Sequence, residues 1–220
     1  MKRKVIKLED PNSSSFGTLT LELEGVSPLI VHRFSKKMEI LRLHEGGKKA
    51  AKPPKNPDRD FAEALYVFGE QPKGEEDLNK KTRYGFPAVA FKSSLVRAAK
   101  LADVSMTDSR SSLFVEPDEG ELVEIFTTSK PEMRVDPVRN QTSVVDIRIR
   151  PMFTNWKVKL RILYNLRGVT AEQLTSWAIS AGRCVGVGEW RPSGRSSSGI
   201  YGCWKVVSAN AVEPDMAGAA

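Results

Sequence analysis

The chain has 220 residues, a formal net charge of +7 and 40% hydrophobic residues, which is enough apolar material for one domain or two small ones. No run of about 18 apolar residues occurs, so the sequence predicts no membrane-spanning helix, and no apolar stretch follows the basic N-terminus as a signal peptide would require. The two cysteines, Cys184 and Cys203, have neither metal-ligand spacing nor a redox motif. We therefore expect buried, reduced thiols in a cytoplasmic protein without a cofactor.

The N-terminal half contains one clear strand and one clear helix. Residues 17–24 alternate between apolar and polar side chains, which predicts a half-buried strand. Residues 43–85 are rich in lysine, proline and glycine and predict a long flexible insertion, in which 58–68 has the spacing of a short helix. Residues 87–103 carry apolar side chains at helical spacing, so we expect a helix there.

The middle of the chain predicts two strands with a projection between them. Residues 121–126 and 144–150 have the composition of strands. The segment that joins them contains two prolines, which do not suit a central strand. We therefore expect a projecting hairpin or loop at about 127–150.

The C-terminal third begins with a strand and a helix. Apolar and basic residues alternate over 157–164, so the three basic side chains share one strand face that either binds nucleic acid or is simply solvated. These side chains are Lys157, Lys159 and Arg161. Thr170 and Gln173 form a capping box that begins a helix, and Gly182 is a possible end of it.

A loop rich in glycine, serine and arginine follows the helix. It contains five glycines between residues 186 and 202 and precedes a final strand predicted at 200–207. The remaining residues, 208–220, are small and acidic, and we expect a disordered tail.

Basic residues gather in the predicted sheet. Between Arg134 and Arg167 there are eight basic residues and only two acidic ones, whereas 43–85 is nearly balanced. This clustering is compatible with a polyanionic partner such as nucleic acid.

Three stretches, in the same order along the chain, resemble motifs of the RAMP superfamily, the RNA-binding subunits of class 1 CRISPR effector complexes. The loop at 186–202, G-V-G-E-W-R-P-S-G-R-S-S-S-G-I-Y-G, is similar to the glycine-rich loop of that superfamily. Residues 87–95, P-A-V-A-F-K-S-S-L, resemble the P-G-S-S-L-K-G-A-L signature of its backbone subunit. Residues 134–139, followed by 146–150, resemble the I-D-R-x-T-G strand and the hairpin after it.

The sequence also departs from these motifs. Residues 88–90 read Ala-Val-Ala where the signature has Gly-Ser-Ser, and Ser93 replaces its second glycine. Pro137 stands in place of the arginine of I-D-R, with Arg139 two residues later. The resemblance covers about residues 17–42 and 86–207.

The resemblance implies an α+β, ferredoxin-like (RRM-like) antiparallel sheet with helices on one face, in a single domain over residues 1–207. It also implies a non-catalytic subunit of an antiviral ribonucleoprotein, which oligomerises head-to-tail along a single-stranded guide RNA. Its partners would be that RNA, further copies of itself and other CRISPR effector subunits, and not a membrane.

The residue types of the glycine-rich loop are suited to binding nucleic acid. Gly186 and Gly188 would let the backbone approach a phosphate, Arg191 and Arg195 would neutralise phosphates, and Trp190 would stack on a base. The alternative is a loop that only connects helix and strand.

Further candidate RNA-binding residues lie within the stretches that resemble RAMP motifs or close to His32 in the sequence. An ordinary solvated basic face is the alternative for the helix residues, and the hairpin arginines are assigned by resemblance alone. The candidates are Arg33, Lys36 and Lys37, then Lys92, Ser93 and Arg97 on the helix, and Arg134, Arg139, Arg148 and Arg150 on the hairpin.

His32 is the one weak candidate for catalysis. A histidine after the first strand could act as a general base on a ribose 2′-hydroxyl, as in the metal-independent endoribonucleases of the superfamily, and the alternative is a structural or phosphate contact. Residues 27–37 contain no Asp or Glu, so the metal-dependent cleavage known in the family is not expected. A single-stranded DNA-binding or annealing protein, stand-alone or phage-borne, is a further alternative.

Overall fold

The structure, a computed structural model, describes residues 15–33, 56–139, 145–194 and 199–214. In this part the protein is α+β, with two antiparallel sheets and four α-helices. None of the described helices is long and apolar enough to cross a membrane.

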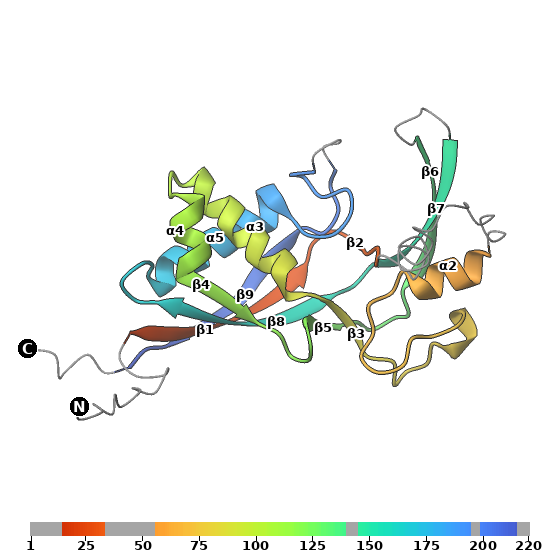
Figure 1. Cartoon of the computed structure of the whole chain (residues 1–220), viewed down its shortest axis with the longest axis horizontal. Helices are drawn as coiled ribbons and strands as arrows, with labels where there is room; N and C mark the ends of the chain where they lie inside the picture. Colours follow the sequence, from red (N-terminus) through yellow and green to blue (C-terminus); the bar gives the residue numbers. More distant parts are fainter. Residues whose placement is uncertain (1–14, 34–55, 140–144, 195–198, 215–220) are drawn as a thin grey trace, which may run out of the picture.

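The larger sheet forms the body of the molecule (Figure 1). Its strand order is β3 (Tyr84–Pro87), β5 (Leu122–Phe126), β8 (Lys157–Asn165), β1 (Phe16–Gly25) and β9 (Trp204–Val212). A further strand, β4 (Leu113–Glu116), also pairs with β8, at residues 161–164, whereas β5 pairs with residues 157–158. All of these pairs are antiparallel. The alternation expected for the first strand holds, since Leu19, Leu21 and Leu23 are buried.

Three helices, α3 (Ala88–Leu101), α4 (Met106–Ser112) and α5 (Ala171–Ser180), cover one face of this sheet (Figure 1). The α5 helix begins with the predicted capping box between Thr170 and Gln173. It does not end at Gly182, as the sequence suggested, but passes into a π-helical turn at Ala181–Val185. Gly186 ends that turn with a positive φ of 69°, and Gly182 instead packs closely on Trp204, where a Cβ would lie 2.3 Å from the backbone oxygen.

The smaller sheet projects from one end of the body (Figure 1). It consists of β2 (Leu29–Ile30), β7 (Val145–Phe153) and β6 (Glu132–Arg139), and β6 and β7 form a hairpin. Helix α2 (Pro57–Glu63), capped by the side chain of Asn56, packs against β7.

Residues 56–85 are folded, which differs from the expected flexible insertion at 43–85. They contain α2, a short 3₁₀ turn at Glu75–Asp77 and β3. Phe61, Leu65 and Leu78 belong to the same hydrophobic core as the leucines of β1. Buried apolar side chains of this size stabilise the fold. The short helix expected at 58–68 is present as α2, although it ends at Glu63.

The chain end also differs from its prediction. The last strand begins at Trp204 and continues to Val212, so residues 208–212 are not part of a disordered tail. Residues 215–220 lie outside the described residues. Glu213 accepts a hydrogen bond of 2.5 Å from the hydroxyl of buried Tyr164, which holds this end against the sheet.

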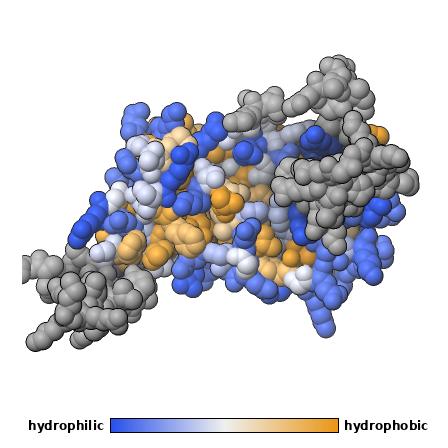
Figure 2. Space-filling model, viewed as in Figure 1, coloured by the Kyte–Doolittle hydropathy of each residue, from blue (hydrophilic) through white to orange (hydrophobic). Residues whose placement is uncertain are grey.

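Carboxylates face the basic residues of β8. Lys157 lies 3.5 Å from Glu24, Arg161 lies 3.1 Å from Glu116, and Lys159 is the register partner of Glu22. Figure 2, which shows hydropathy, has apolar and hydrophilic residues intermixed on the side that it draws. The β8 face is therefore locally balanced in charge, which weakens it as a site for a polyanion.

Candidate nucleic-acid interface

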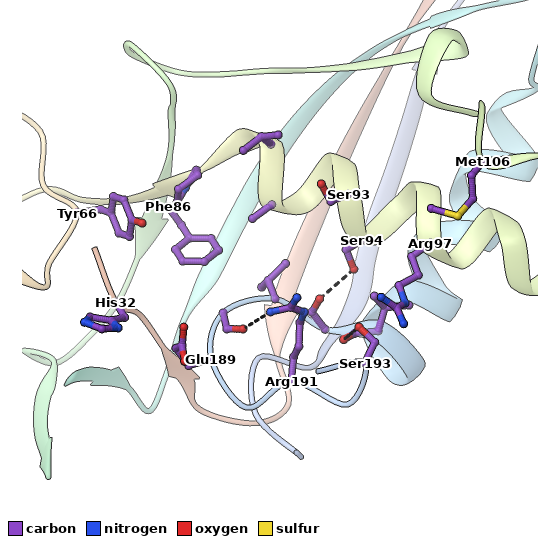
Figure 3. Close-up of a pocket in the computed structure, with 17 residues that line it drawn as sticks. His32, Tyr66, Phe86, Ser93, Ser94, Arg97, Met106, Glu189, Arg191 and Ser193 are labelled. Atoms are coloured by element: carbon purple, nitrogen blue, oxygen red, sulfur yellow. Dashed lines mark hydrogen bonds between the residues drawn. The ribbon is translucent and has the colours of Figure 1, made fainter. Parts of the chain in front are cut away.

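A pocket of about 450 Å³ lies between α3 and the glycine-rich loop (Figure 3). We call it the α3–loop pocket. Helix α3 contributes Ser93, Ser94 and Arg97, and the loop contributes Gly186, Gly188, Glu189, Arg191 and Ser193. His32 and Tyr66 complete the wall. The structure thus brings together residues of two stretches that are about 100 positions apart and that the sequence had singled out separately.

The glycine-rich loop is tied to the segment that follows β1. The N–H of Gly202 donates to the carbonyl of Pro28 (2.8 Å), and the N–H of Glu189 donates to the carbonyl of Ile30 (2.9 Å). The N–H of Val187 donates to the carbonyl of Gly202 (3.0 Å), which joins the two ends of the loop. The described part of the loop is therefore a fixed scaffold and not a free connection.

Two glycines are needed for these close approaches. Gly188 has a φ of 76°, and a Cβ there would lie 2.5 Å from the carbonyl oxygen of Ile30. Gly202 has a φ of 65°, and its Cβ would lie 1.8 Å from the carbonyl oxygen of Val187. These glycines let the loop pack on the protein's own backbone, a role that the sequence analysis had not separated from phosphate binding.

A buried hydrogen bond joins helix and loop at the floor of the pocket. The hydroxyl of Ser94, which is 3% exposed, donates to the carbonyl of Gly186 over 3.1 Å (Figure 3). Close by, no acceptor is recorded among the described residues for the N–H groups of Gly188 and Trp190. Backbone donors of this kind, in a loop with glycines at positive φ, suit an anion.

One end of the pocket carries cations and hydroxyls. Figure 3 shows Arg97, Arg191 and Ser193 on the side of α3 that faces the glycine-rich loop, and Ser93 also lines the pocket. Arg191 is held by a hydrogen bond of 2.8 Å from Nη1 to the carbonyl of Gly188, and Arg97 is exposed. Two guanidinium groups beside hydroxyls are an arrangement that can neutralise and hydrogen-bond a phosphate.

The other end of the pocket carries Glu189, Tyr66 and His32 (Figure 3). Tyr66 packs edge-to-face on Phe86, with 5.7 Å between ring centroids. Burial raises the pKa of the Tyr66 hydroxyl, Arg33 lowers it and Glu189 raises it further, so the phenol stays protonated at neutral pH.

Trp190 packs against two arginines of the hairpin, which changes its expected role. The Cζ atom of Arg134 lies 4.9 Å from the Trp190 ring centroid and that of Arg150 lies 5.3 Å from it. Arg134 also donates to the hydroxyl of Tyr201 (2.8 Å) and to Asp136 (2.9 Å). Trp190 is thus engaged in cation–π contacts that dock the loop on the hairpin, while its side chain remains partly exposed.

Arg150 is buried and does not form part of an exposed binding face, contrary to the prediction. It is 1% exposed and pairs with Asp136 at 3.6 Å, while its Nε and Nη1 atoms have no hydrogen-bond acceptor among the described residues. Burial lowers the pKa of the guanidinium, and the charges of Glu189 and Asp136 partly oppose that effect. The side chain is a structural cation between hairpin and loop.

The remaining candidates that the structure describes do not line the pocket. Arg33 is exposed and its guanidinium donates to Gln71; Lys92 lies outside the pocket; and Arg148 is exposed on β7, opposite Asp136. Arg139 is the register partner of Val145 on the hairpin. Lys36, Lys37 and Arg195 lie outside the described residues.

Three pocket residues were missed by the sequence analysis. Tyr66 comes from the predicted insertion, Ser94 forms the link to Gly186, and Glu189 sits inside the glycine-rich motif. Only Glu189 had a signal, as the single acidic residue among the glycines and arginines of the loop. The thiols also need correction, since Cys184 is exposed and Cys203 is half-buried.

No family model and no curated protein matches the sequence. Among solved structures, a chain of the cryo-EM structure of the type III-B Cmr-beta bound to cognate target RNA is similar, with a TM-score of 0.44 and 11% sequence identity. The match covers 90% of this chain and 61% of that chain, so the protein spans less than two thirds of the length of its neighbour. Function is therefore inferred from the site itself.

Proposed function

We propose that the protein is a non-catalytic, single-stranded RNA-binding subunit whose RNA backbone passes over the α3–loop pocket. The observation that carries this proposal is the meeting of α3 and the glycine-rich loop around one pocket with Arg97 and Arg191 at its rim. These are two of the three stretches in which the sequence resembles RAMP motifs. The pocket is large enough for one nucleotide unit, because small-molecule sites commonly range from about 300 to 1,000 Å³.

A ferredoxin-like fold forms part of the proposal. The order β9, β1, β8, β4 is antiparallel throughout, α3 lies between β1 and β4 in the chain, and α5 lies between β8 and β9. This order supports the βαββαβ arrangement that the resemblance implies. The projecting hairpin would then be the accessory element that reaches toward a neighbouring copy.

Binding of purified protein to fluorescent 40-nucleotide RNA and DNA of equal sequence, across a salt series, tests the proposal. We expect RNA to bind more tightly, with an affinity that falls with salt, because phosphate contacts release counterions. Equal or tighter binding of DNA would support a single-stranded DNA-binding protein instead. Binding to neither would contradict a nucleic-acid role.

Head-to-tail assembly along the RNA is the finer part of the proposal. Heterologous contacts that do not close produce filaments, so negative-stain images of the RNA complex should show regular rods whose length follows the RNA. Discrete particles that contain one protein per RNA would contradict assembly and leave RNA binding intact. Participation in a CRISPR-type effector complex rests on the resemblance and would be tested by co-purification of a guide RNA.

Endoribonuclease activity is a second candidate, favoured by one observation. His32 lines the same pocket as Tyr66 and Glu189, where a ribose could lie within reach of a general base (Figure 3). RNA cleavage without added metal that is lost in His32→Ala would establish it. Intact RNA after long incubation with the wild-type protein would support the non-catalytic assignment.

A further inference from the structure

The two ends of the α3–loop pocket differ in charge. Arg97 and Arg191 occupy one end, and Glu189 occupies the other (Figure 3). A phosphate is attracted to the first end and repelled from the second. A nucleotide in this pocket therefore has one favoured orientation, with its phosphate toward the arginines and its sugar or base toward Glu189.

Glu189 has a fixed backbone and a carboxylate that no described residue uses as an acceptor. Its backbone N–H is held by the carbonyl of Ile30 at 2.9 Å, and its side chain is half-buried. The carboxylate accepts no hydrogen bond from the described residues. Buried Arg150 interacts electrostatically with Glu189. A ligand that brings N–H donors to the carboxylate would gain hydrogen bonds to it.

The surroundings of Glu189 suit a flat, partly apolar group. Tyr66 and Phe86 line the pocket beside it and are fixed by their edge-to-face contact. Among the bases, guanine alone presents two adjacent N–H donors, N1–H and the 2-amino group, which both oxygens of one carboxylate can accept. Adenine and cytosine offer one exocyclic amino group each, and uracil offers one ring N–H. Within an RNA chain a ribose offers only its 2′-hydroxyl, because the 3′-oxygen is esterified.

We propose that the α3–loop pocket is a guanine-selective nucleotide site, in which Glu189 accepts from the Watson–Crick edge of the base while Arg97 and Arg191 hold the phosphate. This inference rests on the proposed function insofar as the natural ligand would be a guanosine within the bound RNA. The site itself requires only a guanine nucleotide.

Competition of GMP, IMP, AMP, CMP and UMP against a short fluorescent RNA tests the inference. We expect GMP to compete about tenfold better than AMP, CMP or UMP, and IMP to fall between them because it lacks the 2-amino group. Glu189→Gln should abolish the preference, because the carboxamide offers one acceptor and turns a donor toward the base. Glu70→Gln, at an exposed loop position outside the pocket, is the matched control and should keep it.

The outcomes separate this inference from the proposed function. Equal competition by all five nucleotides, with RNA binding intact, would contradict the guanine site alone. A guanine preference that survives in a folded Glu189→Gln protein would assign the selectivity elsewhere and also contradict it. Direct calorimetric binding of GMP by a protein that binds no RNA would support the site and contradict the proposed function.

Discussion

The hydroxyl of Ser94 on α3 donates to the carbonyl of Gly186 at the start of the glycine-rich loop, over 3.1 Å and in a buried position. This contact joins the two walls of the α3–loop pocket directly. It adds to the backbone hydrogen bonds that tie the loop to Pro28 and Ile30. The geometry of the proposed binding site therefore depends on a serine that makes no contact of its own with a polyanion.

Asp136 neutralises the buried charge between hairpin and loop, and we expect Asp136→Asn to be strongly destabilising. Asp136 is 5% exposed and is the carboxylate nearest to Arg150. Removal of one partner from a buried ion pair commonly costs about 3–5 kcal/mol. Chemical denaturation measures the free energy of unfolding. The double variant Asp136→Asn/Arg150→Met should be more stable than the single variant, because it also removes the unpaired guanidinium. Equal or lower stability would show that the buried charge of Arg150 does not cause the loss.

Gly202→Ala should destabilise the protein more than Gly120→Ala. Both glycines have a positive φ, 65° and 58°, so both variants bear a backbone cost of about 1–2 kcal/mol. Only at Gly202 would the added Cβ also clash with the protein, because it would lie 1.8 Å from the carbonyl oxygen of Val187. A Cβ at Gly120 would have no atom within 4 Å. Thermal or urea unfolding compares the two variants. Equal losses would mean that the close approach in the loop is not required.

Stability should fall at alkaline pH in part because of Tyr164. Burial raises the pKa of its hydroxyl and the carboxylate of Glu213 raises it further, so the folded state keeps a proton that the unfolded state releases above about pH 10. The contribution is fully present below that pH and is lost as the pH rises, since the unfolded state then binds fewer protons than the folded one. Tyr164→Phe should show a smaller loss of unfolding free energy between pH 9 and 11, relative to its own value at pH 8, by urea denaturation at each pH. The same slope in both proteins would contradict this assignment.

Local periodicity was sufficient to predict several elements. The alternation at 17–24 and 157–164, and the capping box of Thr170 and Gln173, depend on neighbours in sequence, and β1, β8 and α5 occur where these patterns lie. The alternating strands were predictable because one face of the sheet is covered by helices and the other is not.

The burial of Arg150 and the position of Tyr66 could not be predicted from the sequence, because both depend on contacts with residues that are distant in the chain. Arg150 has the pattern of an exposed basic residue, and only the docking of Trp190 and Asp136 around it makes burial possible. Tyr66 reaches the pocket because the segment after α2 pairs with β3, which leads directly into α3, and no local pattern encodes that pairing. The pocket was therefore predictable as two separate basic stretches, but its acidic end was not.

The salt dependence of RNA binding by Arg97→Ala/Arg191→Ala is the most direct test of the proposed interface. If both guanidinium groups contact phosphates, the slope of log affinity against log salt should decrease by about 1.4, because each lost contact with a single strand removes roughly 0.7. Arg167→Ala, at an exposed arginine in the turn after β8, should leave the slope unchanged. A folded double variant that binds RNA with the wild-type affinity and slope would contradict the account and place the RNA elsewhere on the protein.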